Sequence, residues 1–482
     1  MPELLPVLEV EDRIVDALRG HNRLVLTAPT GSGKTTQVPQ MLLRSDAVTG
    51  HILVLQPRRM VTRMAAVRVA QEVGCALGDV VGYQTRHDSR VGTKTRIRFL
   101  TEGVFLRLIQ ADAGLVDVGA VILDEFHERS VATDMSLGLV RRLQEGERPD
   151  LRLIVMSATM DAEAVSQDLE CPGIRAEGRT YPVAVSHWSE GATRPLWEQA
   201  AGALKRVLAE QPTGDVLIFM PGAYEIRRTI ETCRKGLRPE DGQTSFFPLH
   251  ASLSLAEQDA ATGTCPHRKV IVSTNVAETS LTIEGVHHVI DSGLVRMHRF
   301  DVRRGLNVLL VESVSRASAD QRAGRAGRTA PGTCVRLWSE EKEAVLPEQA
   351  PPEVMRIDLS ACVLQLMSMG VADLAAFPWT DPPGTEALRR ALGLLQGLGA
   401  IDGEGVLTGT GHQMALLPMH PRLSRTLIAA SEAGCLQRAT LWVALVSERD
   451  ILLRPIRRQF AERQEGDLQS DLAVMERAFG QA

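Results

Sequence analysis

The sequence has few of the features that mark secreted, zinc-binding or membrane proteins. Its seven cysteines are scattered and none forms a C-x-x-C pair, which argues against a zinc site or a disulfide framework and fits a reducing compartment. No uninterrupted apolar run approaches the length that spans a bilayer. The first residues, MPELLPVLEVEDRIVD, are acidic and lack the basic start and sustained apolar core of a signal peptide. These absences predict a cytoplasmic protein that does not associate with membranes.

Basic residues are also fewer than acidic ones. The formal net charge is −5 at pH 7, and only six of the 54 basic residues are lysines. The overall charge therefore does not attract nucleic acid, and any contact with it must come from a local groove. We draw no function from the excess of arginine, although it makes Lys34 one of very few lysines.

The composition is that of a soluble globular protein, with 44% hydrophobic and 23% charged residues, and 482 residues suffice for about three domains. From residue 22 to about 175, strand-like runs alternate with helical patterns such as Arg59–Val73. The predicted strands lie near Leu24–Thr27, Ile52–Gln56, Arg96–Leu100, Val121–Asp124 and Leu153–Ser157. Such alternation predicts an α/β domain whose parallel sheet carries helices on both faces.

The pattern of strands restarts after EGRTYPVAV (177–185) and changes to helices from about residue 345. The second set of predicted strands comprises Asp215–Gly222, Phe246–His250, Lys269–Asn275 and His287–Gly293. Further on, TEALRRALGLLQGL has one apolar helix face, and AIDGEGVLTGTG has the signal of a hairpin, which together describe a winged helix. We predict domains at 1–178, 179–342, 343–408 and 409–482.

A glycine-rich turn follows the first predicted strand, in LVLTAPTGSGKTTQ (24–37). Gly31 and Gly33 would let backbone N–H groups curl around an anion, and the start of the next helix would add its dipole. Lys34 would reach the β- and γ-phosphates of a nucleotide, and the hydroxyl of Thr35 would ligate Mg²⁺. The first glycine of the usual pattern is alanine here, but strand, loop and helix come in the required order. The segment predicts a phosphate-binding loop; the alternative is a Gly-Ser turn before an ordinary helix.

Two acids end a second buried run, in GAVILDEFHERS (119–130). Acids at the end of a core strand cost solvation free energy unless a cation meets them. The carboxyl ends of parallel strands meet at one edge of the sheet, so these acids would face the phosphate loop. Asp124 would then join the Mg²⁺ shell, and Glu125 would face the attacking water.

A third segment, SADQRAGRAGRTAPG (318–332), lies in the second α/β domain. Gln321, Arg325 and Arg328 recur at helical spacing, so we expect one helix in which two glycines allow close approach. Each glycine costs roughly 1 kcal/mol in a helix, and a plain solvated helix face gains nothing from that cost. The arginines are predicted to reach a γ-phosphate across a cleft, where such fingers contribute roughly 10³ to 10⁵ in rate in other NTPases.

Eight motifs in order resemble those of the DEAH-box group of superfamily 2 RNA helicases, and the match covers nearly the whole chain. They are TAPTGSGKT, LQPRRM, TEGV, DEFHERS, SATM, LIFMPG, STNVAETSLTIEG and QRAGRAGR. Phe126 replaces the name-giving alanine, and with MALLPMHPRLSR and LVSERD this variant resembles the bacterial HrpB branch. The resemblance implies two tandem RecA-like parallel-sheet domains, a winged-helix domain and a helical, ratchet-like segment. It also implies ATP or another NTP, with Mg²⁺, as cofactors.

The resemblance further implies a role for each matching residue. Those expected at the nucleotide are Thr30, Gly31, Ser32, Gly33, Lys34, Thr35, Thr36, Arg68 and Glu284. Those expected at the metal are Thr35, Asp124 and Glu125, and those expected in catalysis are Glu125, His127, Gln321, Arg325 and Arg328. Ser157 and Thr159 match the motif that couples the domains, and Arg58, Thr101, Asn275 and Thr279 match positions that touch the nucleic-acid backbone.

Plainer explanations stay open for the isolated polar residues. His127 could cap a helix instead of linking the nucleotide state to the second domain, and Ser157 could cap the helix that follows it. The four residues matched to nucleic-acid contacts could equally make hydrogen bonds in turns and caps.

One departure from the family concerns the nucleotide base. The family often sandwiches the base between an arginine and an aromatic ring. Arg68 fits the arginine position, but LAEQDAATGTC (255–265) contains no aromatic residue. We therefore predict weak discrimination among ATP, GTP and other NTPs.

Two further features concern the nucleic-acid channel. RMHRFDVRRGLNVLLVES (296–313) resembles the family's β-hairpin that is thought to part strands, although a hairpin covering the edge of a domain would look the same. The family usually continues into a ratchet bundle and an OB-like domain, whereas this chain stops about 75 residues past the predicted wing. We expect either a truncated chain or a channel that lacks one part.

The sequence is best interpreted as an NTP-driven RNA helicase or translocase that is expected to hold single-stranded RNA through phosphates and sugars, with little sequence preference. A DNA-directed helicase is the first alternative, because only a 2′-OH contact distinguishes the two polymers. A nucleotide-binding adaptor without unwinding activity is the second, and the catalytic residues argue against it. Protein partners do not follow from the sequence.

Overall fold

The computed structural model describes residues 5–29, 31–45, 47–158, 162–178, 181–188, 193–237, 244–278, 283–447 and 471–481. Three residues with predicted roles, Thr30, Thr159 and Thr279, lie outside these ranges. The chain divides into two compact units. The first comprises Met1–Ile357 with Pro378–Pro382, and the second comprises Asp358–Phe377 with Pro383–Ala482. No helix among the described residues is long and apolar enough to cross a membrane.

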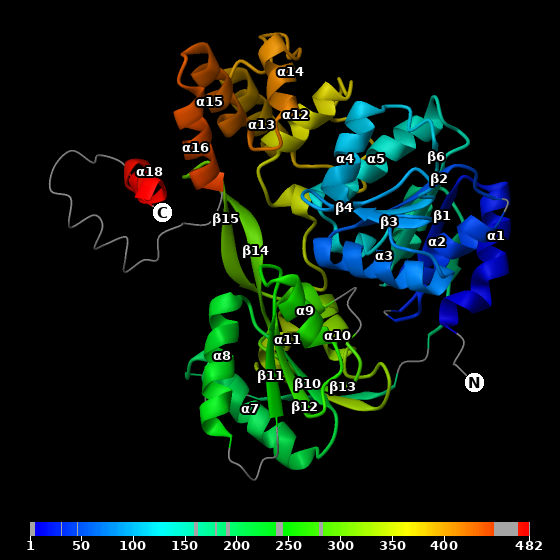
Figure 1. Cartoon of the computed structure of the whole chain (residues 1–482), viewed down its shortest axis with the longest axis vertical. Coiled ribbons are helices and arrows are strands. Elements are labelled where there is room, and N and C mark those ends of the chain that lie inside the picture. The colour runs from blue at the N-terminus through cyan, green and yellow to red at the C-terminus, as the bar shows by residue number, and fades with distance from the viewer. Residues whose placement is uncertain are drawn as a thin grey trace. The chain divides into compact units, whose positions relative to one another are not determined.

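An eight-stranded sheet forms the first half of the first unit (Figure 1). Its order is β4-β3-β5-β2-β6-β7-β1-β8, and all pairs are parallel except β3 with β4. The strands are β1 (Arg23–Thr27), β2 (His51–Gln56), β3 (Val81–Gln84), β4 (Ser89–Arg90), β5 (Ile97–Thr101), β6 (Val118–Leu123), β7 (Arg152–Ser157) and β8 (Gly173–Arg175). Because the central strands are buried on both faces, they read as continuous apolar runs.

Helices cover both faces of this sheet (Figure 1). One face packs on α1 (Glu11–Gly20), α2 (Lys34–Arg44) and α3 (Arg59–Val73), and the other on α4 (Glu102–Ala111) and α5 (Val131–Glu145). Side chains of a strand alternate between faces, so in β1 Leu24 and Leu26 join the core with α1 and α2 while Val25 points the other way.

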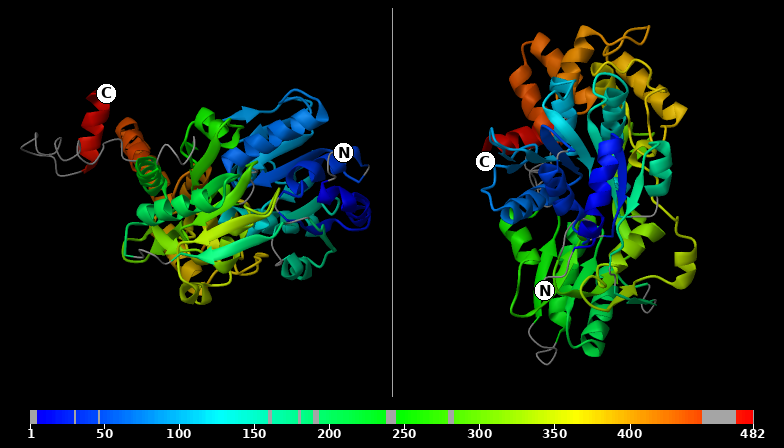
Figure 2. Two further views of the ribbon diagram at one scale, coloured as in Figure 1. Left: turned by 90° about the horizontal axis from the view of Figure 1, so that it is seen from below. Right: turned by 90° about the vertical axis from the view of Figure 1, so that its right-hand side faces the viewer.

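A six-stranded parallel sheet forms the second half, with the order β11-β12-β10-β13-β16-β9 (Figures 1 and 2). The strands are β9 (Val183–His187), β10 (Asp215–Phe219), β11 (Thr244–Leu249), β12 (Arg268–Ser273), β13 (Val286–Asp291) and β16 (Gly332–Arg336). One core joins this sheet to α7 (Leu196–Glu210) and α8 (Ala223–Gly236). The core on the other face joins it to α9 (Leu255–Thr262) and α10 (Arg316–Ala323), and it also includes Met60 of α3. The two halves of the unit therefore share buried apolar contact.

The second unit consists of helices among its described residues. They are α12 (Ser360–Ser368), α13 (Thr385–Gly397), α14 (Gly409–Leu416), α15 (Pro421–Glu432), α16 (Leu436–Ser447) and α18 (Asp471–Gln481). The expected hairpin is present but short, with a turn at 402–406 and a single antiparallel bridge between Ile401 and Leu407. The wing is this short because the Thr408 hydroxyl already accepts from the Gly411 N–H and so caps α14.

The fold class predicted from the sequence is confirmed, and the predicted strands match β1, β2, β5, β6, β7, β10, β11, β12 and β13 within a few residues. The hairpin predicted at 296–313 is also present, as β14 (Leu294–Asp301) and β15 (Leu306–Ser313). One prediction was wrong, because α10 ends at Ala323 and Arg325 and Arg328 lie in the turns that follow it. Gly327 is instead paired with another segment, because its carbonyl accepts from the Tyr181 N–H at 2.9 Å. Only glycine fits this close approach, since a Cβ would lie 2.5 Å from the Tyr181 carbonyl oxygen. The predicted domain boundaries stay predictions.

Candidate nucleotide site

The loop between β1 and α2 has the backbone that an anion site requires. Gly31 and Gly33 both adopt φ +87°, a left-handed conformation that favours glycine. Gly33 is the N-cap of α2, and Lys34 is its first residue, with only 3% of its surface exposed. The N-terminus of the helix and the curled loop can therefore present N–H groups to a phosphate.

The two acids meet this loop at the same edge of the sheet. Asp124 directly follows β6, and its Oδ2 accepts hydrogen bonds from Thr35 Oγ1 and Gln56 Nε2, both at 2.6 Å. Glu125 Oε2 lies 3.7 Å from Lys34 Nζ. Burial, and then the charge of Glu125, raise the pKa of Asp124, while Lys34 lowers it. This end of the sheet therefore carries more negative charge than Lys34 alone balances.

These residues fit a hard divalent cation. Thr35 and Asp124 offer two oxygen atoms that already lie 2.6 Å apart, and Mg²⁺ is bound through oxygen ligands, few of them from protein. Two adjacent buried carboxylates also gain from a nearby positive charge. Gln56, which sequence reasoning did not assign to the site, holds Asp124 in place; its position in LQPRRM, at the end of β2, was the available signal.

The backbone at and after the acid pair contains two non-glycine residues with positive φ. Glu125 adopts φ +52° and Arg129 adopts φ +47°, on either side of the short helix η2 (Phe126–Glu128). For a residue with a side chain each such conformation costs about 1–3 kcal/mol, and it persists only where the surroundings enforce it. The loop that aims Glu125 is therefore held by its neighbours.

The arginines reach the same place from the second sheet. Arg325 is buried and Arg328 is half-buried, and removal from water lowers the pKa of each, that of Arg328 to about 10. The charge of Glu125 counteracts this effect at both guanidinium groups. Arg325 Nε also donates to the carbonyl of Glu278 at 3.0 Å. Residues from both halves of the first unit thus converge where a γ-phosphate would lie.

A buried ion network holds the turn that positions Arg325, and sequence reasoning missed it. Arg322 is 1% exposed and bonds to Glu278 Oε2 at 2.8 Å and to Asp291 Oδ1 at 2.9 Å. Its guanidinium also lies over the ring of Phe219. Ser318 Oγ donates to Glu278 Oε1 at 2.6 Å, so the carboxylate ties α10 to the turn whose carbonyl positions Arg325. A pairing between residues 31 and 44 positions apart left no local signal in the sequence.

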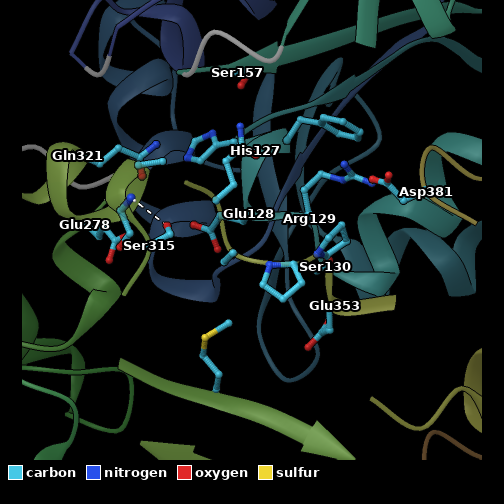
Figure 3. A pocket seen from close by; sticks show the side chains of 18 of the residues that line it. His127, Glu128, Arg129, Ser130, Ser157, Glu278, Ser315, Gln321, Glu353 and Asp381 are labelled. Carbon is cyan, nitrogen blue, oxygen red and sulfur yellow. Dashed lines mark hydrogen bonds and ion pairs between the residues drawn. The ribbon is translucent and has the colours of Figure 1, made fainter. Parts of the chain in front are cut away.

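A cavity of about 730 Å³ adjoins the acid loop and is lined by His127, Ser157 and Gln321 (Figure 3). His127 Nδ1 lies 3.6 Å from Glu125 Oε2, and Gln321 of α10 points toward the histidine. Neither ring nitrogen of His127 makes a hydrogen bond within the described part of the chain, so it does not cap a helix there. The side chain is instead placed between Glu125 and the second sheet.

The predicted nucleic-acid residues within the described part of the chain lie at or just past the ends of strands, and Thr101 is the register partner of Gln56, two residues before Arg58. Arg58 pairs with Glu128 at 3.1 Å and donates to the carbonyl of Asn275, so it bridges the two halves. Thr101 is the N-cap residue of α4 without a side-chain cap hydrogen bond. Their contact with a polymer stays a prediction.

Two residues predicted at the nucleotide lie further out. Arg68 is exposed and pairs with Glu72, whose other oxygen accepts from Gln37 and Gln40 of α2. This chain of contacts places Arg68 beside the helix that begins at Lys34. Glu284 is exposed just before β13 and stays a prediction.

A further carboxyl group with a shifted pKa lies behind the acid loop. Glu102, the first residue of α4, is buried and accepts hydrogen bonds from Ser130 Oγ at 2.5 Å and from the hydroxyl of Thr133. Burial raises its pKa from 4.5 to about 7. The start of α4 is thereby joined to the N-cap of α5.

The stability of the protein is expected to depend on the charge of Glu102. Because its folded pKa lies above the unfolded value, its contribution is complete below about pH 4.5 and is lost as the pH rises through about 7. The shift corresponds to roughly 3 kcal/mol. The melting temperature of Glu102→Gln should therefore be about 5 °C or more above that of the wild type at pH 8. At pH 4.5 the two melting temperatures should lie much closer together. Thermal unfolding of both proteins at the two pH values measures this, and an equal difference at both would contradict it.

Comparisons with known proteins cover most of the chain. Residues 9–167 match the DEAD/DEAH box helicase family, and residues 199–330 match the helicase conserved C-terminal domain. Residues 391–419 and 420–478 match the winged-helix and ratchet-like parts of the helicase associated domain HA2.

Individual proteins are similar over almost the full chain. A probable ATP-dependent RNA helicase DHR2 of Saccharomyces cerevisiae is 40% identical over 94% of this chain and 63% of its own length. The ATP-dependent RNA helicase HrpB of Escherichia coli is 40% identical over 92% of this chain and 55% of its own length. The crystal structure of Escherichia coli DEAH/RHA helicase HrpB superposes with a TM-score of 0.88 at 39% identity, over 93% of this chain and 57% of that one. The chain thus spans less than two thirds of the length of each of these proteins.

Proposed function

Because this chain belongs to the DEAD/DEAH-box helicase family, as the DEAH-box, HrpB-like type, we propose that it is an NTP-driven RNA helicase or translocase. The observation that carries the proposal is the convergence of Lys34, Glu125 and Arg328 from the two halves of one unit. A protein that only binds nucleotide has no need of a buried acid facing arginines from a second domain.

The residues of the site divide the chemistry among them. Lys34 and the N–H groups of the loop would bind the β- and γ-phosphates, and Thr35 with Asp124 would hold Mg²⁺, whose charge stabilises the triphosphate. Glu125 would accept a proton from the attacking water, which Gln321 would orient. Arg325 and Arg328 would stabilise the charge that develops on the transferred phosphoryl group.

Movement along RNA would follow from the dependence of this site on both halves. Arg58, with contacts to Glu128 and to the carbonyl of Asn275, joins the two halves near the acid loop. When hydrolysis changes the distance between the halves, such bridging residues change partners. Contacts to phosphates and sugars would make binding tolerant of sequence and sensitive to salt. A cytoplasmic location fits the seven free cysteines.

The deciding experiment compares NTP turnover with single-stranded RNA, with single-stranded DNA and without polymer. We expect stimulation by RNA of at least tenfold at low salt, with a smaller effect of DNA. Stimulation by DNA alone would favour a DNA-directed helicase. Turnover that no polymer changes would contradict the motor and favour a nucleotide-binding adaptor.

Selectivity for the base is expected to be weak. Arg68 lies exposed beside α2, and α9 with the residues up to 265 offers no aromatic ring to stack on the other face of a base. Stacking on an aromatic residue is worth about 1–3 kcal/mol per base, so its absence removes the strongest contact to the base. The values of kcat/KM for ATP, GTP, CTP and UTP should lie within about tenfold of one another. A preference for ATP far above tenfold would contradict this prediction.

A further inference from the structure

The loop that carries Glu125 and His127 is held by two chain segments that come after the second sheet. Asp381 Oδ2 lies 2.7 Å from Arg129 Nη2. The backbone N–H of Glu353 donates to the carbonyl of Arg129 at 3.0 Å, and its carboxylate accepts from the N–H of Val131 at 3.0 Å. The Arg129 carbonyl and the Val131 N–H, on either side of Ser130, are thus both bonded to a residue from outside the first sheet.

Arg129 is the centre of these contacts. Its guanidinium bonds to Asp134 of α5 at 3.0 Å, lies over the ring of Phe126, and extends toward Asp381 (Figure 3). Asp134 has a fully buried side chain, so it depends on Arg129 for its counter-charge. Arg129 therefore stays anchored to α5 whether or not Asp381 is present.

The loop needs this support. Glu125 and Arg129 both hold left-handed backbone conformations that side chains disfavour, and only surrounding contacts maintain them. Within the described residues, Glu353 and Asp381 contact Arg129 and Val131 from outside the loop and α5. A shift of the segment that carries Glu353 or of the one that carries Asp381 would therefore change the position of the Glu125 carboxylate.

The two segments are continuous with the second unit. Glu353 lies in η5 (Glu353–Met355), just before the first unit ends at Ile357. Asp381 lies in Pro378–Pro382, a short return to the first unit that is flanked on both sides by residues of the second. Whatever displaces the chain at α12 or α13 thus acts on the segments that hold the loop.

We propose that Arg129, Glu353 and Asp381 form a latch that couples nucleic acid held by the winged-helix and ratchet-like parts to the position of Glu125. The three are positioning residues and touch no substrate. The inference rests on the proposed function, which it deepens by naming the path from polymer to hydrolysis.

The test uses Asp381→Ala and Glu353→Ala in the full chain. Hydrogen exchange without polymer should become about tenfold faster in the amides of residues 126–131. Even with faster exchange, residues 126–131 would keep the described conformation most of the time, so turnover without polymer should stay within about twofold of the wild type. Stimulation by single-stranded RNA should fall at least fivefold, with the KM for NTP unchanged.

A matched control is available on the same helix. Arg141 of α5 pairs with Asp168 at 2.9 Å, and Asp168 and Asp381 are both 38% exposed. Asp168 lines the same cavity, but its ion pair is with Arg141 of α5 and not with residues 126–131. Asp168→Ala therefore removes an equivalent ion pair without removing a bond to the acid loop, and it should change neither exchange nor stimulation.

Each outcome decides the proposal. If both variants behave like Asp168→Ala in exchange and in stimulation, or lose turnover equally with and without polymer, the latch is overturned. If the wild type itself is not stimulated by any polymer, the proposed function fails. Exchange in residues 126–131 then still decides whether Glu353 and Asp381 hold the loop.

Discussion

Glu125→Gln is expected to lower the kcat of NTP hydrolysis by about 10³-fold while the KM for NTP changes only a few-fold. General-base catalysis contributes about 10² to 10⁴ in rate, and glutamine keeps the shape of the side chain but cannot accept the proton of the water. Lys34, Thr35 and Asp124, which would bind the phosphates and metal, are unchanged, so binding should survive. Steady-state turnover at saturating NTP and Mg²⁺ measures the effect.

Folding can be separated from chemistry in this variant. The buried carboxylates of Asp124 and Glu125 repel each other, and the pKa of Asp124 is raised partly for that reason. The substitution removes this repulsion but also removes the counter-charge of Lys34, so the two effects oppose each other and the melting temperature without Mg²⁺ should change little. A variant that turns over within tenfold of the wild type would show that Glu125 is not the base.

Arg328→Ala is expected to lower kcat by about 10³ to 10⁵, the range that arginine fingers contribute in other NTPases. Burial lowers the pKa of Arg328 to about 10, because removal from water disfavours the charged guanidinium. The protein thus keeps a costly cation at the place where negative charge develops during hydrolysis. For the same reason the substitution should not lower the melting temperature without nucleotide.

A double substitution tests whether the two residues serve one transition state. If Glu125 and Arg328 act together, the kcat of the double variant should be no more than about tenfold below that of the poorer single variant. If the loss of kcat in the double variant equals the product of the two single losses, Glu125 and Arg328 act independently. The convergence of the two halves would then not contribute to catalysis. Arg304→Ala, an exposed arginine in the hairpin, is a control that should keep turnover without polymer unchanged.

Most of the fold could be predicted because the buried parallel strands are continuous apolar runs between helical patterns. The edge strand β9 was read only as the start of the second domain, since its residues are largely exposed and carry no apolar run. The segment at 318–332 was predicted as one helix because arginine spacing alone cannot reveal a close approach to Tyr181. The wing has only one bridge, because Thr408 and Gly411, which also fit a hairpin, are used to cap α14.

The site itself could be predicted where function is encoded in adjacent residues. Lys34, Thr35, Asp124 and Glu125 lie together as expected, since parallel strands bring their ends to one edge. Glu278 and Arg322 could not be paired from the sequence, because they are 44 positions apart and the other partner of Arg322, Asp291, is 31 positions away. Arg129 was unremarkable in the sequence, and its importance comes from Glu353 and Asp381, more than 200 residues later.

The order β6-β7-β1 has a mechanical consequence. Adjacent strands lie about 4.8 Å apart, so the strand that leads to the acids and the strand that leads to the lysine loop are separated by about 10 Å. β7 therefore acts as a spacer whose width is set by backbone hydrogen bonds and not by side chains. The backbone distance between the lysine loop and the acids is thus a fixed dimension of the sheet, and adjustment during turnover is left to the groups that cross from the other half.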